Sequence, residues 1–403
     1  MSGLLEGLKV VEVATFVFVP AAGTVLSDFG ADVIHVEPPG VGDPYRLLKN
    51  LAPNPECEEN YCWQIDSRNK KSVVIDLKKK EGRKVLLDLV RDADIFITNY
   101  HPSVLEELEI TYDLLSQENP RLIYAHGTGY GEVGTETEKP GYDATAWWAR
   151  SGLMDVVRPG EGELAKSSPG MGDHPSAMSV FGGIALALYA RERTGKGTKV
   201  STSLMSNGVW ANGILVQAAL SGATTFKPSS QSKPANAIVN HYRTSDGDAF
   251  FLVLVKEATE FDSFCKAIGR PELSKDPRFE EINNRRLNAG ALAEILQDWF
   301  GKRPTSEWRK VLDENDITFG TIATTDEVAR DPQMEANGVF VELADSPGTR
   351  VVNSPIELSD FPKRQPISPP ELGEHSVPVL KSLGYNEERI ATLMQSGIIG
   401  GKK

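Results

Sequence analysis

A short stretch from Pro169 to Met178, PGMGDHPSAM, places a carboxylate and an imidazole between glycines and a helix-like apolar run. Aspartate is a preferred N-cap, so Asp173 could serve only to begin that helix. The same position suits chemistry, because the positive end of a helix dipole keeps a carboxylate ionised and flanking glycines admit a substrate. An ionised, positioned carboxylate can attack an activated acyl group. The residues alone favour the cap, and they indicate that His174 shapes the loop rather than acting as a base.

Basic residues gather once in the sequence, around a short predicted strand within 67–80. Lysines commonly flank the edge of a sheet, where water solvates them. The alternative is a phosphate site at that edge, which the residues alone favour less. The cluster consists of Arg68, Lys70, Lys71, Lys78, Lys79 and Lys80.

Other common catalytic motifs are missing. The sequence holds no P-loop pattern, no G-x-S-x-G nucleophile elbow and no H-E-x-x-H pair. A G-x-G-x-x-G occurs at Gly129, Gly131 and Gly134, but the polar segment after it contains Pro140 and does not open the helix that a dinucleotide site needs. We therefore expect an ordinary glycine loop. The histidines, including His126 at a predicted strand end, and the cysteines lack metal-ligand spacing, so no metal site is expected.

The elements that must position Asp173 follow two patterns. Strand-like and helix-like segments alternate over the first 135 residues, which indicates a parallel, doubly wound α/β sheet with ligands at the carboxyl ends of its strands. Strand-like pieces return in the last seventy residues. Between these parts we predict helices at 142–152, 173–195 and 204–222, a linker at 222–239, and a hairpin that turns at Asp246-Gly247.

Composition limits the classes of function. The 403 residues are 40% hydrophobic and 25% charged, as is usual for a globular protein, with a formal net charge of −13. This charge argues against a nucleic-acid or membrane-surface binder, and no run of 18 apolar residues predicts a membrane span. The three cysteines, Cys57, Cys62 and Cys265, are a sparse, odd set that fits a reducing compartment. We expect a cytoplasmic protein.

The chain resembles the class III (CaiB/BaiF-type) coenzyme A transferases over nearly its whole length. The similarity begins with LEGLKVVEVATFVFVPAAGTVLSDFGADVIHVEPPGVGDPYR, continues through NKKSVVIDLKKKEGRKVLLDLVRDADIFITNYHPSVLEEL and NPRLIYAHGTGYGEVG, and is strongest in PGMGDHPSAMSVFGGIALALYARERTGKGTKVSTSLMSNG. Within the family, PGYDATAWWARSG and PGMGDH look most similar to transferases acting on 2-hydroxy acids in amino-acid fermentation, such as the phenyllactate and 2-hydroxyisocaproate CoA-transferases.

This resemblance implies that coenzyme A moves from an acyl-CoA, here a 2-enoyl-CoA, to a carboxylic acid, here an (R)-2-hydroxy acid. The family's nucleophile falls on Asp173, which would form an aspartyl anhydride and then an aspartyl-CoA thioester. CoA thioesters are then substrates, and no permanently bound cofactor is expected. The alternative is a 2-methylacyl-CoA racemase, which needs a second acid/base. Tyr142 stands where the racemases have a histidine, and tyrosine is a poor base near neutral pH, which favours the transferase.

The resemblance also implies where CoA binds. Pro38 and Glu107 stand where some relatives have arginines, which leaves open whether Arg46, Arg68, Lys70 or Lys71 holds the CoA phosphates. The segment SSQSKPANAIVN has no evident match to the glycine-rich lid of formyl-CoA transferases. The family's CoA contacts fall on Val17, Phe18, Ile75, Lys78, Asn99, Tyr100, His101, Tyr142 and Asp143.

The architecture implied by the resemblance has three parts. Residues 1–225 form a Rossmann-like large domain that carries the CoA site and the nucleophile. Residues 226–335 form a smaller α+β domain, and residues 336–403 return to the large domain. Family members are interlocked homodimers, in which each chain threads a ring made by the other, and we expect the same here.

Overall fold

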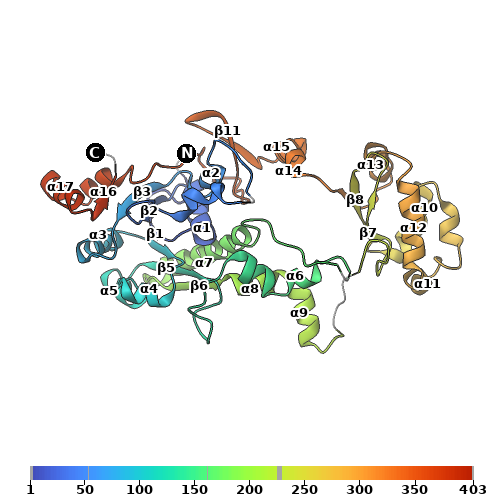
Figure 1. Ribbon diagram of the computed structural model, residues 1–403, viewed down its shortest axis with the longest axis horizontal. Helices are drawn as coiled ribbons and strands as arrows, with labels where there is room; N and C mark the ends of the chain where they lie inside the picture. The colour runs from blue at the N-terminus through green and yellow to red at the C-terminus, as the bar shows by residue number, and fades with distance from the viewer. Residues whose placement is uncertain (1–2, 53, 161, 225–228, 402–403) are drawn as a thin grey trace. The chain divides into compact units, whose positions relative to one another are not determined.

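The computed structural model describes residues 3–52, 54–160, 162–224 and 229–401 (Figure 1). The chain divides into two compact units. The large unit comprises Met1–Met154, Lys166–Ala223 and Gln333–Lys403, and the small unit comprises Asp155–Ala165 and Thr224–Pro332. Residues 155–165, which the sequence-based division assigns to the large domain, thus belong to the small unit. The predicted boundary between residues 225 and 226 lies outside the described residues.

The large unit is built on a seven-stranded, mostly parallel sheet, as predicted. Six parallel strands lie in the order β3-β2-β1-β4-β5-β6, which is the strand order of a Rossmann-type doubly wound sheet. The seventh strand, β12, pairs antiparallel with β3 at the edge. The strands are β1 (Lys9–Val13), β2 (Asp32–Glu37), β3 (Lys71–Ile75), β4 (Ile95–Thr98), β5 (Ile123–Thr128), β6 (Lys199–Ser203) and β12 (Ile399–Gly400).

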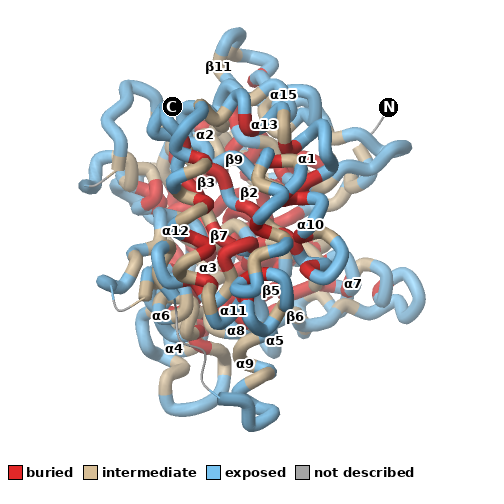
Figure 2. Tube along the Cα trace, turned by 90° about the vertical axis from the view of Figure 1, so that its right-hand side faces the viewer, coloured by how far each residue is buried: buried red, intermediate tan, exposed pale blue. Residues whose placement is uncertain are grey.

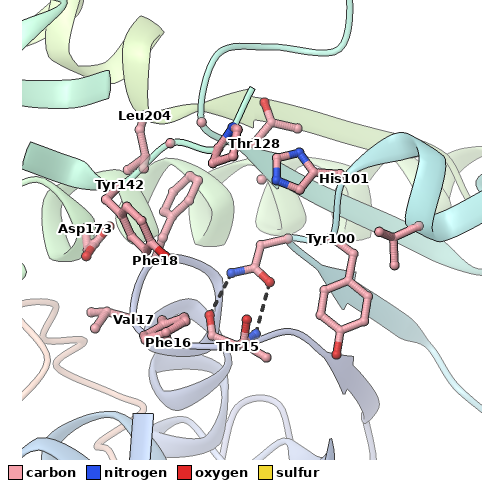
Figure 3. A pocket seen from close by; sticks show the side chains of 16 residues that line it. Thr15, Phe16, Val17, Phe18, Tyr100, His101, Thr128, Tyr142, Asp173 and Leu204 are labelled. Atoms are coloured by element: carbon pink, nitrogen blue, oxygen red, sulfur yellow. Dashed lines mark hydrogen bonds between the residues drawn. The ribbon is translucent and has the colours of Figure 1, made fainter. Parts of the chain in front are cut away.

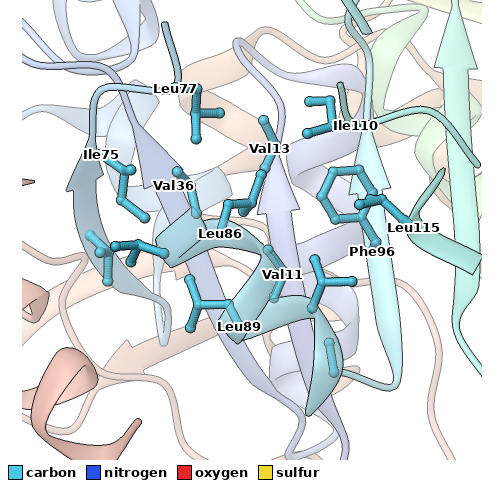
Figure 4. Close-up of a cluster of buried hydrophobic side chains, with 14 of the residues drawn as sticks. Val11, Val13, Val36, Ile75, Leu77, Leu86, Leu89, Phe96, Ile110 and Leu115 are labelled. Atoms are coloured by element: carbon cyan, nitrogen blue, oxygen red, sulfur yellow. The ribbon is translucent and has the colours of Figure 1, made fainter. Parts of the chain in front are cut away.

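The core of the large unit follows from the apolar patterns of its strands and helices. The strands read as nearly continuous apolar runs because helices cover both faces of a parallel sheet. Helix α3 (Lys80–Arg91) is amphipathic and buries Val85, Leu86 and Leu89 against the sheet. Figure 4 shows Leu86 and Leu89 packed over side chains of β1 to β4. Helix α1 (Phe18–Asp28) is buried along its whole length.

The C-terminal segment completes the large unit. Strands β10 (Phe340–Leu343) and β11 (Ser346–Val352) form a hairpin, and helices α16 (Ser376–Ser382) and α17 (Glu387–Gln395) precede β12. The hydroxyl of Ser376 accepts a hydrogen bond from the Val74 amide (3.1 Å), and the His375 amide donates to the Ser72 carbonyl (2.9 Å). The C-terminus is thereby fixed to the β3 edge of the sheet.

Two predicted helices differ in the structure. The helix predicted at 204–222 is two helices, α8 (Leu204–Ala211) and α9 (Gly213–Leu220), separated by Asn212, whose side-chain amide donates to the Ser151 carbonyl (3.0 Å). The helix predicted at 142–152 is the shorter π-helical segment η2 (Asp143–Ala149). The helix predicted at 173–195 is α7 (Asp173–Thr194), which ends at Gly195 with a left-handed φ of 71°.

The small unit has a three-stranded antiparallel sheet covered by helices. The predicted hairpin is present as β7 (Val239–Arg243) and β8 (Ala249–Val253), and β9 (Phe319–Thr321) pairs with β8. Aromatic rings fill its core, including Phe300 edge-on to Phe250 and Trp308. In Figure 2 the buried parts of the chain, in red, include strands of both sheets. The helices are α10 (Glu257–Ala267), η3 (Pro271–Lys275), α11 (Ile282–Leu287), α12 (Ala289–Phe300), α13 (Thr305–Glu314) and α14 (Thr325–Val328).

The remaining helices are short. They are η1 (Pro44–Asn50), α2 (Tyr61–Ser67), α4 (Pro102–Glu107), α5 (Tyr112–Glu118), α6 (Leu153–Val156) and α15 (Pro332–Ala336).

A buried ion cluster joins side chains of β1 and β2 to Asp43 and to Lys70, which directly precedes β3. The Lys70 ammonium bonds both Glu12 carboxylate oxygens (2.8 and 3.1 Å), and neither side chain is more than 1% exposed. The His35 imidazole lies between Glu12 and Asp43, 2.6 and 3.4 Å from their oxygens. Burial alone would lower the pKa of His35, but contacts with Asp43 and Glu12 raise it to about 9. These charges are compensated inside the fold.

We expect Lys70→Met to destabilise the protein strongly. The substitution leaves Glu12 buried with a charge that only His35 still neutralises, and breaking a buried pair costs about 3–5 kcal/mol. Lys71→Met is the matched control, because Lys71 pairs with Asp32 at the surface with 40% of its side chain exposed, where a pair contributes about 0–1 kcal/mol. Urea unfolding of both variants measures the difference, and equal losses would contradict this account of the cluster.

Candidate active site

The central pocket of the large unit opens at the point where the strand order reverses. Strands β1 and β4 are neighbours, but the connections after them run in opposite directions along the sheet, and ligands of such sheets bind in the crevice left there. A pocket of about 370 Å³ occupies this position. It is lined by Thr15, Phe16, Val17, Phe18, Asn99, Tyr100, His101, Val104, Gly127, Thr128, Gly129, Pro140, Gly141, Tyr142, Asp173 and Leu204.

Hydrogen bonds join the two loops that form the floor of the pocket. The Asn99 side chain accepts from the Thr15 amide (3.0 Å) and donates to the Thr15 carbonyl (2.7 Å), as Figure 3 shows by dashed lines. Phe16 has a left-handed φ of 62°, which is unfavourable for a residue with a bulky side chain. Its amide donates to Asp43 (3.2 Å), and its ring meets Tyr142 edge-on. These contacts hold the loop after β1 in its strained form.

Asp173 enters the pocket from the start of α7. It is the first residue of the helix and Gly172 is the N-cap, so the expectation that Asp173 caps the helix is wrong. Its carboxylate accepts no hydrogen bond from any residue that the structure describes. In Figure 3 Asp173 and Tyr142 lie at one end of the pocket and Tyr100 at the other. The carboxylate is therefore available to react with a bound molecule.

The electrostatics of Asp173 oppose its ionisation. Burial, and next the nearby Asp143, raise its pKa to about 8, whereas the neighbouring His174 lowers it. The sequence predicts a carboxylate that the helix dipole keeps ionised, and at neutral pH burial and Asp143 outweigh that effect. A half-buried carboxylate with a raised pKa, lining a pocket, is a common mark of a functional site.

Asp143 is placed behind the pocket rather than in its wall. One carboxylate oxygen accepts the Ala144 amide (2.7 Å) and the other accepts the Gly172 amide (3.3 Å), immediately before Asp173. A Cβ on Gly172 would lie 2.6 Å from the Trp147 ring, so only glycine fits between Asp143 and that ring. Asp143 thus fixes the start of α7, and its neighbour Tyr142 lines the pocket.

A second pocket of about 550 Å³ lies along the same edge of the sheet. It shares Tyr100 and Val104 with the first, and its wall includes Ile75 and Lys78. The structure therefore gathers eight of the nine residues of the predicted CoA site around two pockets with common walls. Those eight are Val17, Phe18, Asn99, Tyr100, His101 and Tyr142 in the first pocket, Ile75 and Lys78 in the second, and Tyr100 in both.

The four basic residues considered for the CoA phosphates are all engaged within the protein. Arg46 makes two bonds to Glu37 (both 2.8 Å) and lies over the Trp63 ring. Arg68 donates two hydrogen bonds to the buried carboxylate of Asp28, Lys70 bonds Glu12, and Lys71 bonds Asp32. Three of these pairs are buried or nearly so. Lys78, by contrast, is exposed in the wall of the second pocket.

The glycine motif after β5 serves close packing. The chain from Gly131 onward runs in turns rather than opening a helix, as expected. A Cβ on Gly129 would lie 2.9 Å from the Gly141 Cα, so the two backbones touch directly within the pocket wall. His126 lies inside β5 rather than at its end, and it bonds the Tyr100 carbonyl (2.8 Å) through one ring nitrogen and Glu132 through the other. His126 thus connects the β4 and β5 loops.

Sequence reasoning missed one group beside Asp173. The His174 imidazole bonds Asp66 of α2 (3.0 Å), and the Tyr45 hydroxyl donates to the other oxygen of Asp66 (2.5 Å). The expectation that His174 only shapes its loop is incomplete. Asp66 and His174 are 108 positions apart, and no spacing in the sequence indicates that they meet.

Known proteins share both the sequence and the fold. A family model described as CoA-transferase family III matches residues 5–376. The (R)-2-hydroxy-4-methylpentanoate CoA-transferase of Clostridioides difficile is 34% identical over 399 residues, 98% of this chain and 99% of that protein. The cinnamoyl-CoA:phenyllactate CoA-transferase of Clostridium sporogenes is 32% identical, covering 97% and 96%. The crystal structure of a CAIB/BAIF family protein from Brucella suis aligns with a TM-score of 0.84 at 29% identity, covering 95% and 100%.

Fold, family model and relatives together define an α/β enzyme that transfers coenzyme A. The chain belongs to CoA-transferase family III, the class III family that its sequence resembles. The predicted family and enzyme class are thereby confirmed. The racemase alternative is not favoured, because these relatives are transferases.

Among the residues that the structure describes, no helix is long and apolar enough to cross a membrane. No group of three or more His, Cys, Asp or Glu side chains in the same part of the chain is arranged to hold a metal ion.

We expect Asp143→Asn to lower the pKa of Asp173. The substitution removes a negative charge but keeps an oxygen that can accept the Gly172 amide, and a neighbouring like charge typically shifts a carboxyl pKa by about one unit or more. Carbon-13 titration of carboxyl-labelled aspartate measures it, with Asp173→Asn assigning the resonance. Asp113→Asn, at an exposed position of α5, is the control. An unchanged Asp173 titration in Asp143→Asn would contradict the role of Asp143.

Proposed function

We propose that this CoA-transferase uses Asp173 as its nucleophile and moves coenzyme A from a 2-enoyl-CoA to an (R)-2-hydroxy acid. The observation that carries the proposal is the free Asp173 carboxylate in a pocket at the switch point of the sheet. The substrate class is supported by the two relatives named above, whose names specify a 2-hydroxy acid or phenyllactate as the acid.

In the proposed reaction each step exchanges one acyl bond for another. An Asp173 oxygen attacks the thioester carbon of the donor, the C–S bond breaks, and a mixed anhydride and the CoA thiolate form. The thiolate attacks the Asp173 carbonyl and releases the donor acid, which leaves an aspartyl-CoA thioester. The carboxylate of the acceptor attacks this thioester and expels the thiolate, forming a second anhydride. The thiolate then attacks the acceptor's carbonyl, and the Asp173 carboxylate is restored.

The two pockets with common walls suit an elongated CoA thioester. We place the reacting thioester and the pantetheine arm in the first pocket, which Asp173 lines, and the nucleotide end in the second, next to Lys78. Backbone and side-chain contacts then come from Val17, Phe18, Asn99, Tyr100, His101, Tyr142 and Ile75, while Asp143 acts through the start of α7.

We also propose a homodimer. Large apolar side chains on three consecutive helices of the large unit are highly exposed in a single chain, which is unusual unless another protein surface covers them. A second copy of the chain is the partner that the family resemblance implies, and the interlocked arrangement belongs to the same proposal. The exposed side chains are Leu186 and Tyr189 of α7, Trp210 of α8, and Ile214 and Leu220 of α9.

We also propose a cytoplasmic location. The cysteines support it, because all three are described and all are free thiols.

We expect Asp173→Ala to lower kcat by at least about a thousandfold, because no other group can form the covalent intermediates. Wild-type protein mixed with an acyl-CoA alone should gain acyl or CoA mass on the peptide that contains Asp173, measured by mass spectrometry. A donor and acceptor screen with cinnamoyl-, isocaprenoyl-, crotonyl- and acetyl-CoA against 2-hydroxy acids identifies the pair. Undiminished transfer by Asp173→Ala would disprove the proposed nucleophile.

We expect Lys78→Ala to raise the KM for the acyl-CoA about fivefold with little change in kcat. Lys78 is exposed at the second pocket, and an accessible ammonium–phosphate contact contributes about 1 kcal/mol. The nearby Lys71→Ala, which removes a lysine already paired with Asp32, is the matched control and should leave KM unchanged. Steady-state kinetics at low ionic strength measure both variants. Equal effects of the two would contradict the placement of the nucleotide end.

A further inference from the structure

The His174 ring is held between two groups that can only accept hydrogen bonds. Its Nε2 lies 3.0 Å from an Asp66 carboxylate oxygen, and its Nδ1 lies 3.2 Å from the Gly170 carbonyl oxygen. A neutral imidazole has one donor and one acceptor nitrogen, so it satisfies only one of these contacts. Both contacts are satisfied only when both nitrogens carry protons. The geometry therefore describes an imidazolium.

Asp66 is itself held firmly in place. Its side chain is 2% exposed, and its second oxygen accepts the Tyr45 hydroxyl (2.5 Å). Its backbone carbonyl accepts the Thr24 hydroxyl of α1 (2.5 Å). The Tyr45 amide in turn bonds Asp43, the residue that also holds the Phe16 amide in the pocket floor. A continuous set of hydrogen bonds thus fixes the position of Asp66, and through it the ring of His174.

We propose that the Asp66–His174 pair supplies a fixed positive charge beside Asp173, and that this charge offsets part of the cost of ionising the nucleophile, a cost that burial and the negative charge of Asp143 impose. The inference rests on the proposed role of Asp173. His174 acts through Asp173 and does not line its pocket, so it is a positioning residue rather than a catalytic one.

The other charged groups around the Asp66–His174 pair do not lower the pKa of Asp173. Asp143 and Asp66 both raise the pKa of Asp173, and His174 alone among the groups acting on it lowers that pKa. Burial lowers the pKa of His174, but Asp66 raises it to about 9. Helix α8 carries no charged residue, and on α1 Asp28 is neutralised by Arg68. The remaining titratable groups facing the pair or its pocket are Tyr45, Cys62, Tyr100, His101, Tyr142 and Glu357.

The sign of the expected effect follows from the reactive form of Asp173. The carboxylate attacks and the carboxylic acid does not, so the rate falls as pH decreases through the pKa of Asp173. An adjacent opposite charge typically lowers a carboxyl pKa by about 1–3 units. Loss of the His174 charge should therefore move the acidic limb of the pH–rate profile toward higher pH.

The decisive variant is His174→Gln, because glutamine can still donate a hydrogen bond to Asp66 but carries no charge. In kcat/KM measured against pH, we expect its acidic limb to lie about one pH unit or more above that of the wild type, with an approximately tenfold loss at neutral pH. At high pH the rate should approach that of the wild type. His174→Lys, which restores a positive charge, should move the limb back. A loss that is equal at every pH would show a structural role and overturn the inference.

Asp66→Asn provides a second variant that stays informative if His174→Gln does not fold. An asparagine can accept from Tyr45, but its amide faces His174, whose Nε2 must then be unprotonated. Both charges of the pair are lost together, so we expect an alkaline shift smaller than that of His174→Gln. Thermal unfolding of each variant controls for loss of fold. If Asp173→Ala still transfers coenzyme A, the proposed function is refuted. If Asp173→Ala is inactive but neither His174→Gln nor Asp66→Asn shifts the acidic limb of the pH–rate profile, this inference alone is refuted.

Discussion

The active-site pocket depends on one electrostatic constraint, a half-buried carboxylate that lies close to two other carboxylates. Asp173 sits at the start of α7 with Asp143 behind it and Asp66 nearby, and burial and Asp143 together raise its pKa to about 8. Such a group is costly to ionise but, once ionised, is a poorly solvated anion and therefore reactive. The neighbouring His174, held by Asp66, offsets part of that cost.

The sheet provides the space in which this carboxylate can act. Because the chain leaves β1 and β4 in opposite directions, a crevice opens between their loops, and the reciprocal bonds of Asn99 and Thr15 keep those loops at a fixed separation. The strained backbone of Phe16 is held by Asp43, which is part of the buried ion cluster with His35 and Glu12. The shape of the pocket thus depends in part on the buried ion cluster of Glu12, His35 and Asp43.

Sequence reasoning located the sheet because its strands are apolar runs separated by helices with clear ends, and such patterns are local. It placed the start of α7 within one residue, because the predicted cap, Asp173, is the first residue of the helix. It did not foresee the break at Asn212, whose side chain bonds Ser151, a contact between residues 61 positions apart. It also left Arg46, Arg68, Lys70 and Lys71 as candidates for phosphate binding, since the sequence does not reveal that each faces a carboxylate in the fold. The predicted site residues were assigned from the family resemblance. Only the structure shows that His174 pairs with Asp66.

The most direct test of the account follows an oxygen atom through Asp173. An acceptor acid labelled with heavy oxygen in its carboxylate should, through the second anhydride, leave one labelled oxygen on the restored Asp173 carboxylate. Mass spectrometry of the peptide containing Asp173 after turnover measures this transfer directly. The account predicts label in that peptide and, after further turnovers, in the released donor acid. Label in the released acid with none in Asp173 would show direct exchange between the substrates and would contradict a covalent role for Asp173.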